Sequence, residues 1–173
     1  MRALLLSLLL ALPAEAQTEV DVELVLLADT TGSIDANELL FQRQGYATAI
    51  TDPRVVTAIR NTLTGRVAIT YVEWAGPDAQ VPVVGWTVID GDETAQAFAD
   101  ALLGPPRLAF GSNAIGAALM AGQAFIEGND IDGLRRVIDF SGDSANNRAG
   151  PAVGPARQAV LEAGITINAL AIL

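Results

Sequence analysis

Three residue types are missing from the 173-residue chain: it has no cysteine, no histidine and no lysine, so all ten basic residues are arginine. These absences exclude disulfides, zinc–thiolate sites, cysteine nucleophiles and a Ser-His-Asp triad. A Walker-type phosphate loop would lack its lysine. Any metal site must therefore be built from oxygen atoms, which favours Mg²⁺, Ca²⁺ or Mn²⁺ over zinc or copper.

Basic charge is also scarce, because 20 acidic residues face 10 basic ones and the formal net charge is −10. An acidic chain of this kind argues against nucleic acid and against anionic membrane surfaces as partners. It is compatible with binding a cation but does not show it, since most acidic surfaces are simply solvated.

The amino-terminal stretch has the pattern of a secretory leader. Arg2 is followed by an apolar run over residues 3–12 and then by small residues at Ala14 and Ala16. This pattern predicts a signal peptide over residues 1–16, a mature domain over 17–173, and a periplasmic or secreted location. The alternative, a membrane anchor, would need about 20 apolar residues. No later segment is long and apolar enough to span a membrane.

The rest of the chain alternates apolar, strand-like runs with helix-like segments. The expected strands cover residues 20–28, 66–73, 81–89 (one or two short edge strands), 136–140 and 165–172, and the expected helices cover 35–50, a short segment from 52, 93–103, 113–127 and 153–163. This order predicts an α/β fold, with a mainly parallel central sheet and helices on both faces. Because the sequence stops in an apolar strand, we expect the domain to be C-terminally incomplete.

Hydroxyl and carboxylate residues follow two of the predicted strands and precede one helix. Asp29, Thr31 and Ser33 come after the first strand, Ser112 lies just before the helix at 113, and Asp143 follows the strand that ends at 140. In open α/β sheets, ligands bind at the carboxyl ends of the strands, so these side chains should meet there. Taken singly, each residue is more typical of a turn or a helix cap.

Three segments resemble the motifs of von Willebrand factor A domains. Residues 25–33 are similar to an apolar strand ending in Asp-x-Ser-x-Ser. Residues 110–119 are similar to the Gly-Thr-x-x-Gly-x-Ala-Leu stretch, and residues 137–143 to a strand followed by Thr-Asp-Gly. Residues 71–76 and 139–143 further resemble an uncharacterised bacterial exported branch of these domains. The resemblance covers nearly the whole mature chain and implies the same fold without the family's last strand and helix.

The resemblance also implies a metal-ion-dependent adhesion site (MIDAS). Thr31, Ser33 and Ser112 would be direct ligands of Mg²⁺, Mn²⁺ or Ca²⁺, and Asp29 and Asp143 would act mainly through bound waters. Thr31 stands where serine is usual, Ser112 stands where threonine is usual, and one extra residue precedes Asp143.

The function that follows is a module that binds a protein partner presenting Asp or Glu. A metal-dependent hydrolase and a scaffold with an empty site remain as alternatives. A phosphatase of the haloacid dehalogenase type is disfavoured, because it would need a second Asp at the position of Thr31 and a lysine, and this chain has neither. Glu73 and Trp74 end a strand at the same edge, where they either line the ligand surface or form a packed Trp beside a solvated Glu.

Overall fold

The structure is a computed structural model that describes residues 17–172. The predicted signal peptide over residues 1–16 lies outside the described residues. Among the residues described, no helix has both the length and the hydrophobicity needed to cross a membrane.

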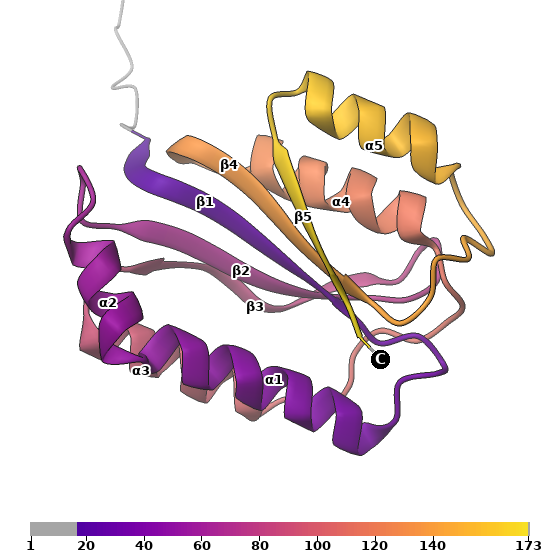
Figure 1. Cartoon of the computed structure of the whole chain (residues 1–173), viewed down its shortest axis with the longest axis horizontal. Helices are drawn as coiled ribbons and strands as arrows, with labels where there is room; N and C mark the ends of the chain where they lie inside the picture. The colour runs from indigo at the N-terminus through magenta and orange to yellow at the C-terminus, as the bar shows by residue number, and fades with distance from the viewer. Residues whose placement is uncertain (1–16, 173) are drawn as a thin grey trace, which may run out of the picture.

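A five-stranded sheet with the order β3-β2-β1-β4-β5 forms the centre of the fold (Figure 1). Four neighbouring strands run parallel and one edge strand, β3, is antiparallel. The strands are β1 (Thr18–Asp29), β2 (Val67–Trp74), β3 (Gln80–Ile89), β4 (Ile131–Gly142) and β5 (Thr166–Ala171). The prediction of a mainly parallel α/β sheet is confirmed, and the predicted edge segment forms a single strand with irregular pairing rather than two strands.

Helices cover both faces of this sheet, as predicted. On one face lie α1 (Ala36–Thr51), α2 (Pro53–Arg60) and α3 (Asp92–Leu103), and on the other lie α4 (Ile115–Glu127) and α5 (Val153–Glu162) (Figure 1). Each face has its own apolar core, one shared with α1, α2 and α3 and the other with α4 and α5. The two cores pack the central strands between two layers of helices, and this packing fixes the positions of the strand ends.

The central strand β1 supplies side chains to both cores. Leu26 and Ala28 pack under α1 and α3, whereas Val25 and Leu27 face α4 and α5. Burial on both faces explains why this segment is a continuous apolar run rather than an alternating one. Each large apolar side chain buried in this way contributes roughly 1.5–3 kcal/mol relative to exposure.

The loop after β1 ends at a helix cap. Asp35 accepts hydrogen bonds from the backbone amides of Asn37 (2.7 Å) and Glu38 (2.9 Å), and the Glu38 side chain accepts one from the Asp35 amide (2.7 Å). This reciprocal capping box satisfies amides that the first helical turn leaves free. It therefore fixes where the polar loop over residues 30–35 must turn into α1.

Two of the differences from the predicted element boundaries bear on the site. β4 begins at Ile131 rather than 136, because the polar residues ahead of the apolar core pair with the start of β1 through their backbones (Thr18 opposite Ile131). α4 begins at Ile115 rather than 113, so Ser112 lies before the helix and is not its cap, which is Ala114.

Candidate metal site

Three segments that are distant in sequence meet at the carboxyl ends of the central strands. The Thr30 amide donates to the Trp74 carbonyl at the end of β2 (3.0 Å), and the Gly32 amide donates to the Gly111 carbonyl ahead of α4 (3.1 Å). The third segment joins through Asp143, which follows β4 and donates its amide to an Asp29 carboxylate oxygen (3.1 Å). The sheet edge therefore brings together the three polar loops that were predicted to meet there.

Asp29 lies beneath this edge and is completely buried. One carboxylate oxygen accepts from the Thr31 amide (2.8 Å) and the other from the Asp143 amide (3.1 Å). Burial raises the pKa of Asp29. The hydrogen bonds from Thr31 and Asp143 act in the opposite direction, and the nearby Asp143 charge adds to the increase. Asp29 thus ties the β1 and β4 loops together and brings negative charge under the site.

The three predicted hydroxyl residues line one cavity of about 240 Å³. The Thr31 and Ser33 hydroxyl oxygens are 3.1 Å apart, and Ser112 approaches from the loop before α4. Thr31 is almost fully buried, whereas Ser33 and Ser112 are exposed, so the cavity opens to solvent. The complete lining consists of Thr31, Gly32, Ser33, Gly111, Ser112, Asn113 and Arg148.

Two buried acceptors at this edge have no hydrogen-bond donor among the described residues. They are a carboxylate oxygen of Asp143 (Oδ1) and the side-chain oxygen of Asn113 (Oδ1). Leaving a buried acceptor unsatisfied costs about 1–3 kcal/mol, and a cation or its bound waters would remove that cost. The set of neutral hydroxyls and two carboxylates suits a hard divalent cation. Residues 17–172 contain no cluster of three or more carboxylates that could hold a metal, so a cation at this edge would need hydroxyl oxygens among its ligands.

Gly111 is the residue that allows Ser112 to reach the cavity. Its φ of +146° is a conformation that other residues rarely adopt, and a Cβ at this position would lie 2.6 Å from the Gly76 amide nitrogen. The Ala114 amide, on the other side of Ser112, donates to the Ala75 carbonyl (3.0 Å). The segment that carries Ser112 is therefore packed directly on the end of β2.

Glu73 does not line the ligand surface, because it is completely buried. It forms an ion pair with Arg43 of α1 (2.5 Å), and its second oxygen accepts from the amides of Leu108 (2.6 Å) and Ala109 (3.1 Å). Arg43 also donates to the carbonyls of Pro105 and Pro106. The expectation of a solvated Glu is wrong, and the pair anchors the segment that leads to Ser112.

Trp74 is also completely buried, so it packs in the core and does not face the ligand. Its indole nitrogen donates to the Ser141 carbonyl (3.1 Å), and its ring stacks on Phe140 with centroids 4.8 Å apart. Trp74 thereby links the ends of β2 and β4, which lie on either side of β1.

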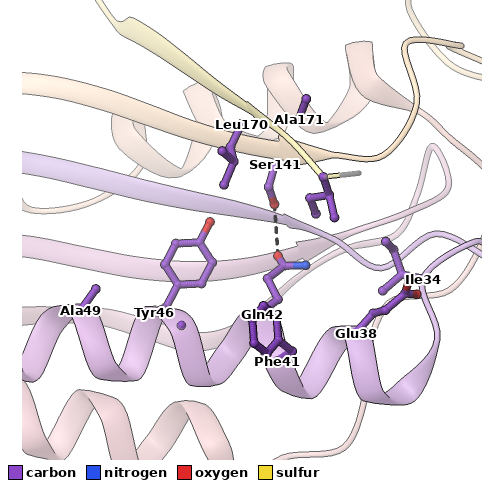
Figure 2. A pocket seen from close by; sticks show the side chains of 11 residues that line it. Ile34, Glu38, Phe41, Gln42, Tyr46, Ala49, Ser141, Leu170 and Ala171 are labelled. Carbon is purple, nitrogen blue, oxygen red and sulfur yellow. Dashed lines mark hydrogen bonds between the residues drawn. The ribbon is translucent and has the colours of Figure 1, made fainter.

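A larger apolar groove of about 500 Å³ lies between α1 and the ends of β4 and β5 (Figure 2). Phe41 and Leu170 form part of its walls. The Gln42 side chain reaches from α1 toward β4 and accepts a hydrogen bond from the Ser141 hydroxyl (3.1 Å). The Gln42 amide also donates to the Asp29 carbonyl (3.4 Å). Gln42 therefore connects this groove to Asp29, the last residue of β1, beneath the candidate metal site.

A family model described as "Protein of unknown function (DUF1194)" matches residues 19–173. No curated protein sequence matches the chain. Among solved structures, the pilus adhesin SpaC from Lactobacillus rhamnosus GG shares 14% identity over 90% of this chain and 25% of its own, with a TM-score of 0.64.

Two further structures have the same fold. Proximal thread matrix protein 1 from the mussel byssus, with a zinc-occupied MIDAS motif, shares 16% identity over 88% of this chain and 38% of its own (TM-score 0.64). A von Willebrand factor type A protein from Catenulispora acidiphila shares 18% identity over 87% and 33% of the two chains (TM-score 0.61). This chain thus spans between a quarter and two-fifths of these structures, and its fold is that of von Willebrand factor A domains.

Proposed function

The chain belongs to the family described as protein of unknown function DUF1194, and for this member we propose an adhesion-type role: it holds an acidic group of a protein partner at a bound divalent cation. The single observation that carries the proposal is the cavity lined by Thr31, Ser33 and Ser112, with the Thr31 and Ser33 hydroxyl oxygens 3.1 Å apart. The fold and the neighbouring MIDAS-containing structure support it.

In this proposal the hydroxyls of Thr31, Ser33 and Ser112 are the direct ligands, and Asp29 and Asp143 hold the ion through waters. The hydroxyls are neutral, so the ion would keep most of its positive charge. It would then attract a carboxylate strongly at an open position. Mg²⁺ is the expected ion, with Mn²⁺ or Ca²⁺ as substitutes, because all the ligands are oxygen atoms.

The proposed setting is outside the cytoplasm, as a periplasmic or secreted protein. The leader pattern over residues 1–16 supports export. One structural neighbour is a pilus adhesin and another is a thread matrix protein, which agrees with a role in contacts between proteins. No contact or geometry among the described residues favours the alternative of a metal-dependent hydrolase, so we propose binding rather than catalysis.

The immobilised protein can test this role by capturing partners from a periplasmic extract in Mg²⁺. We expect chelator to release the specific partner. Raising the salt concentration should weaken capture little or strengthen it, because salt screens the repulsion between an acidic partner and this acidic chain over a Debye length of about 8 Å. Replacing one Asp or Glu of the captured partner should abolish binding, whereas replacing its basic residues should not.

A partner that stays bound in chelator and dissociates steeply with salt would indicate an ordinary electrostatic interface. The adhesion-type role would then be wrong. Asp29→Ala serves as the site variant in the same experiment, and Asp100→Ala serves as its control, because Asp100 is an exposed carboxylate on α3.

A further inference from the structure

Arg148 contributes to the wall of the same cavity as Thr31, Ser33 and Ser112. Its backbone is held there by contacts to the residue next to Ser112: the amides of Arg148 (2.7 Å) and Ala149 (3.3 Å) both donate to the Asn113 carbonyl. The loop after β4 thus brings an arginine against the segment that carries a candidate ligand of the ion.

Asn147 fixes the loop from the other side. Its side-chain oxygen accepts from the Gly116 amide in the first turn of α4 (3.2 Å), and its side-chain nitrogen donates to the Pro151 carbonyl (3.0 Å). These contacts attach the loop to the start of α4, so the position of Arg148 beside Ser112 is set by the fold.

The Arg148 guanidinium has no acidic partner within residues 17–172. The three ion pairs formed there use Arg43, Arg54 and Arg60, and the Arg148 side chain forms no hydrogen bond with the described residues. In a chain with twice as many acidic as basic residues, an exposed arginine that lines the cavity and forms no ion pair with the described residues is available to an incoming anion.

The chemistry of the proposed ligand leaves such a donor a clear task. A carboxylate that binds the ion through one oxygen keeps its second oxygen free. The guanidinium is the side chain best suited to that oxygen, because its charged N–H groups form strong hydrogen bonds with carboxylates. At about 240 Å³ the cavity is smaller than the roughly 300–1,000 Å³ of typical drug-sized sites, so it suits one small anionic group.

We propose that Arg148 is the second anchor for the ligand: the cation binds one oxygen of the partner's carboxylate, and Arg148 donates to the other. This inference rests on the proposed function and extends it, because it makes the ligand a carboxylate held from two sides. Arg148 is not a metal ligand, since a guanidinium carries positive charge and has no acceptor. Its replacement should therefore weaken carboxylate binding without weakening metal binding.

The test uses Mn²⁺ as the metal and N-acetyl-aspartate methylamide, which carries a single carboxylate, as the probe. Free Mn²⁺ measured by electron paramagnetic resonance gives the metal affinity. The water-proton relaxation enhancement of bound Mn²⁺ should fall as the carboxylate displaces bound water, which gives the probe affinity. The proteins compared are wild type, Arg148→Ala, Arg148→Lys and a control, Arg157→Ala, which removes an exposed arginine of α5.

In Arg148→Ala we expect the half-saturating probe concentration to rise about tenfold or more, the loss typical of a hydrogen bond to a charged group. The Mn²⁺ affinity should stay equal or increase slightly, because a nearby positive charge is removed. Arg148→Lys should be intermediate, since lysine keeps the charge but loses the planar pair of donors. Arg157→Ala should behave like wild type, and the matching asparagine probe should bind none of the proteins.

The possible failures are distinguishable. If Arg148→Ala binds both Mn²⁺ and the probe as wild type does, the second anchor is wrong and the metal site stands. If wild type binds Mn²⁺ but not the probe, both the carboxylate ligand and the anchor are wrong. If wild type does not bind Mn²⁺ at all, the proposed function fails together with this inference.

Discussion

Glu73 and Arg43 show how single residues in this fold act at a distance from the cavity. Both side chains are almost completely buried, at 0% and 4% exposure. Burying an ion pair does not by itself guarantee stability, because each charge loses its hydration. Here Arg43 also donates hydrogen bonds to the backbone carbonyls of residues 105 and 106, and Glu73 accepts hydrogen bonds from the backbone amides of residues 108 and 109. We interpret it as a positioning pair for the loop that ends in Ser112.

Replacing one member should leave the other as an uncompensated buried charge. We expect Glu73→Gln to lower the free energy of unfolding by about 3–5 kcal/mol. The ion pair between exposed Arg54 and half-buried Asp52 provides the control, and Arg54→Met should cost less than about 1 kcal/mol. Chemical denaturation of the purified variants measures both values.

A second variant separates positioning from stability. Arg43→Met combined with Glu73→Leu replaces the pair by apolar side chains of similar size and should recover part of the stability that Glu73→Gln loses, because no uncompensated charge stays buried. It cannot restore the acceptor for the Leu108 and Ala109 amides, so the affinity for Mn²⁺ should remain below that of wild type. A double variant that is stable and binds Mn²⁺ with wild-type affinity would show that the pair is structural only.

At the scale of elements, the first half of β1 carries two buried carboxylates, Asp21 and Glu23, whose pKa values are shifted in opposite directions. Asp21 accepts four hydrogen bonds from residues 62–64, and these outweigh the effect of burial, so its pKa lies below the usual range. Burial instead raises the pKa of Glu23, and the hydrogen bond from Asn129 (2.6 Å) offsets this only in part. The two residues should therefore affect stability with opposite dependence on pH.

The signs follow from the unfolded-state pKa values of about 3.9 for Asp and 4.3 for Glu. The stabilisation by Asp21 is present above about pH 4 and is lost as the pH falls below it. The loss of folding stability caused by ionising the buried Glu23 carboxyl is absent below about pH 4 and develops as the pH rises above it. Relative to wild type, Asp21→Asn should be destabilised most near neutral pH and less below about pH 4. Glu23→Gln should become more stable than wild type as the pH rises above about 4.

Urea denaturation of both variants at several pH values measures these differences. Gln at position 23 keeps an acceptor for Asn129, so its behaviour reports mainly the lost charge. If both differences from wild type were independent of pH, the electrostatic account of β1 would be wrong.

Element prediction from the sequence worked best where apolar periodicity was strong. The residue pattern alone predicts the apolar strands β1 and β2 and a helix that begins at about residue 35. The first residues of β4 were missed because they are polar and join the sheet through backbone pairing, which leaves no periodic pattern. The sequence predicts that Ser112 directly precedes a helix, but α4 begins only at Ile115. The conformation of Gly111 and the hydrogen bond from the Ala114 amide to the Ala75 carbonyl hold this segment outside the helix.

At the scale of the whole molecule, topology explains why part of the site was predictable. Parallel strands place their carboxyl ends at one edge, so three polar loops in the right order are expected to meet there. The contacts that support the site were not predictable in the same way. Arg43 and Glu73 are 30 residues apart and fit no local pattern, and Arg148 stands in a polar loop whose course depends on Asn113 and Asn147.

The overall charge of −10 adds a constraint on binding. A strongly acidic chain repels an acidic partner at long range, so electrostatic steering cannot provide the recognition. The proposed interaction must then depend on short-range contacts to the cation and to Arg148. Partner binding should therefore depend strongly on the metal and weakly or inversely on salt.

The central claim is that Thr31, Ser33 and Ser112, supported by Asp29 and Asp143, hold one divalent cation. Thermal unfolding of the purified protein with Mg²⁺ or with chelator tests it most directly. An ion present at a hundredfold excess over its Kd stabilises the folded state by about 2.7 kcal/mol, or roughly 5–11 °C in Tm for a domain of this size. We expect such a rise for wild type and Asp100→Ala and none for Asp29→Ala. Equal melting temperatures of wild type in Mg²⁺ and in chelator would contradict the claim.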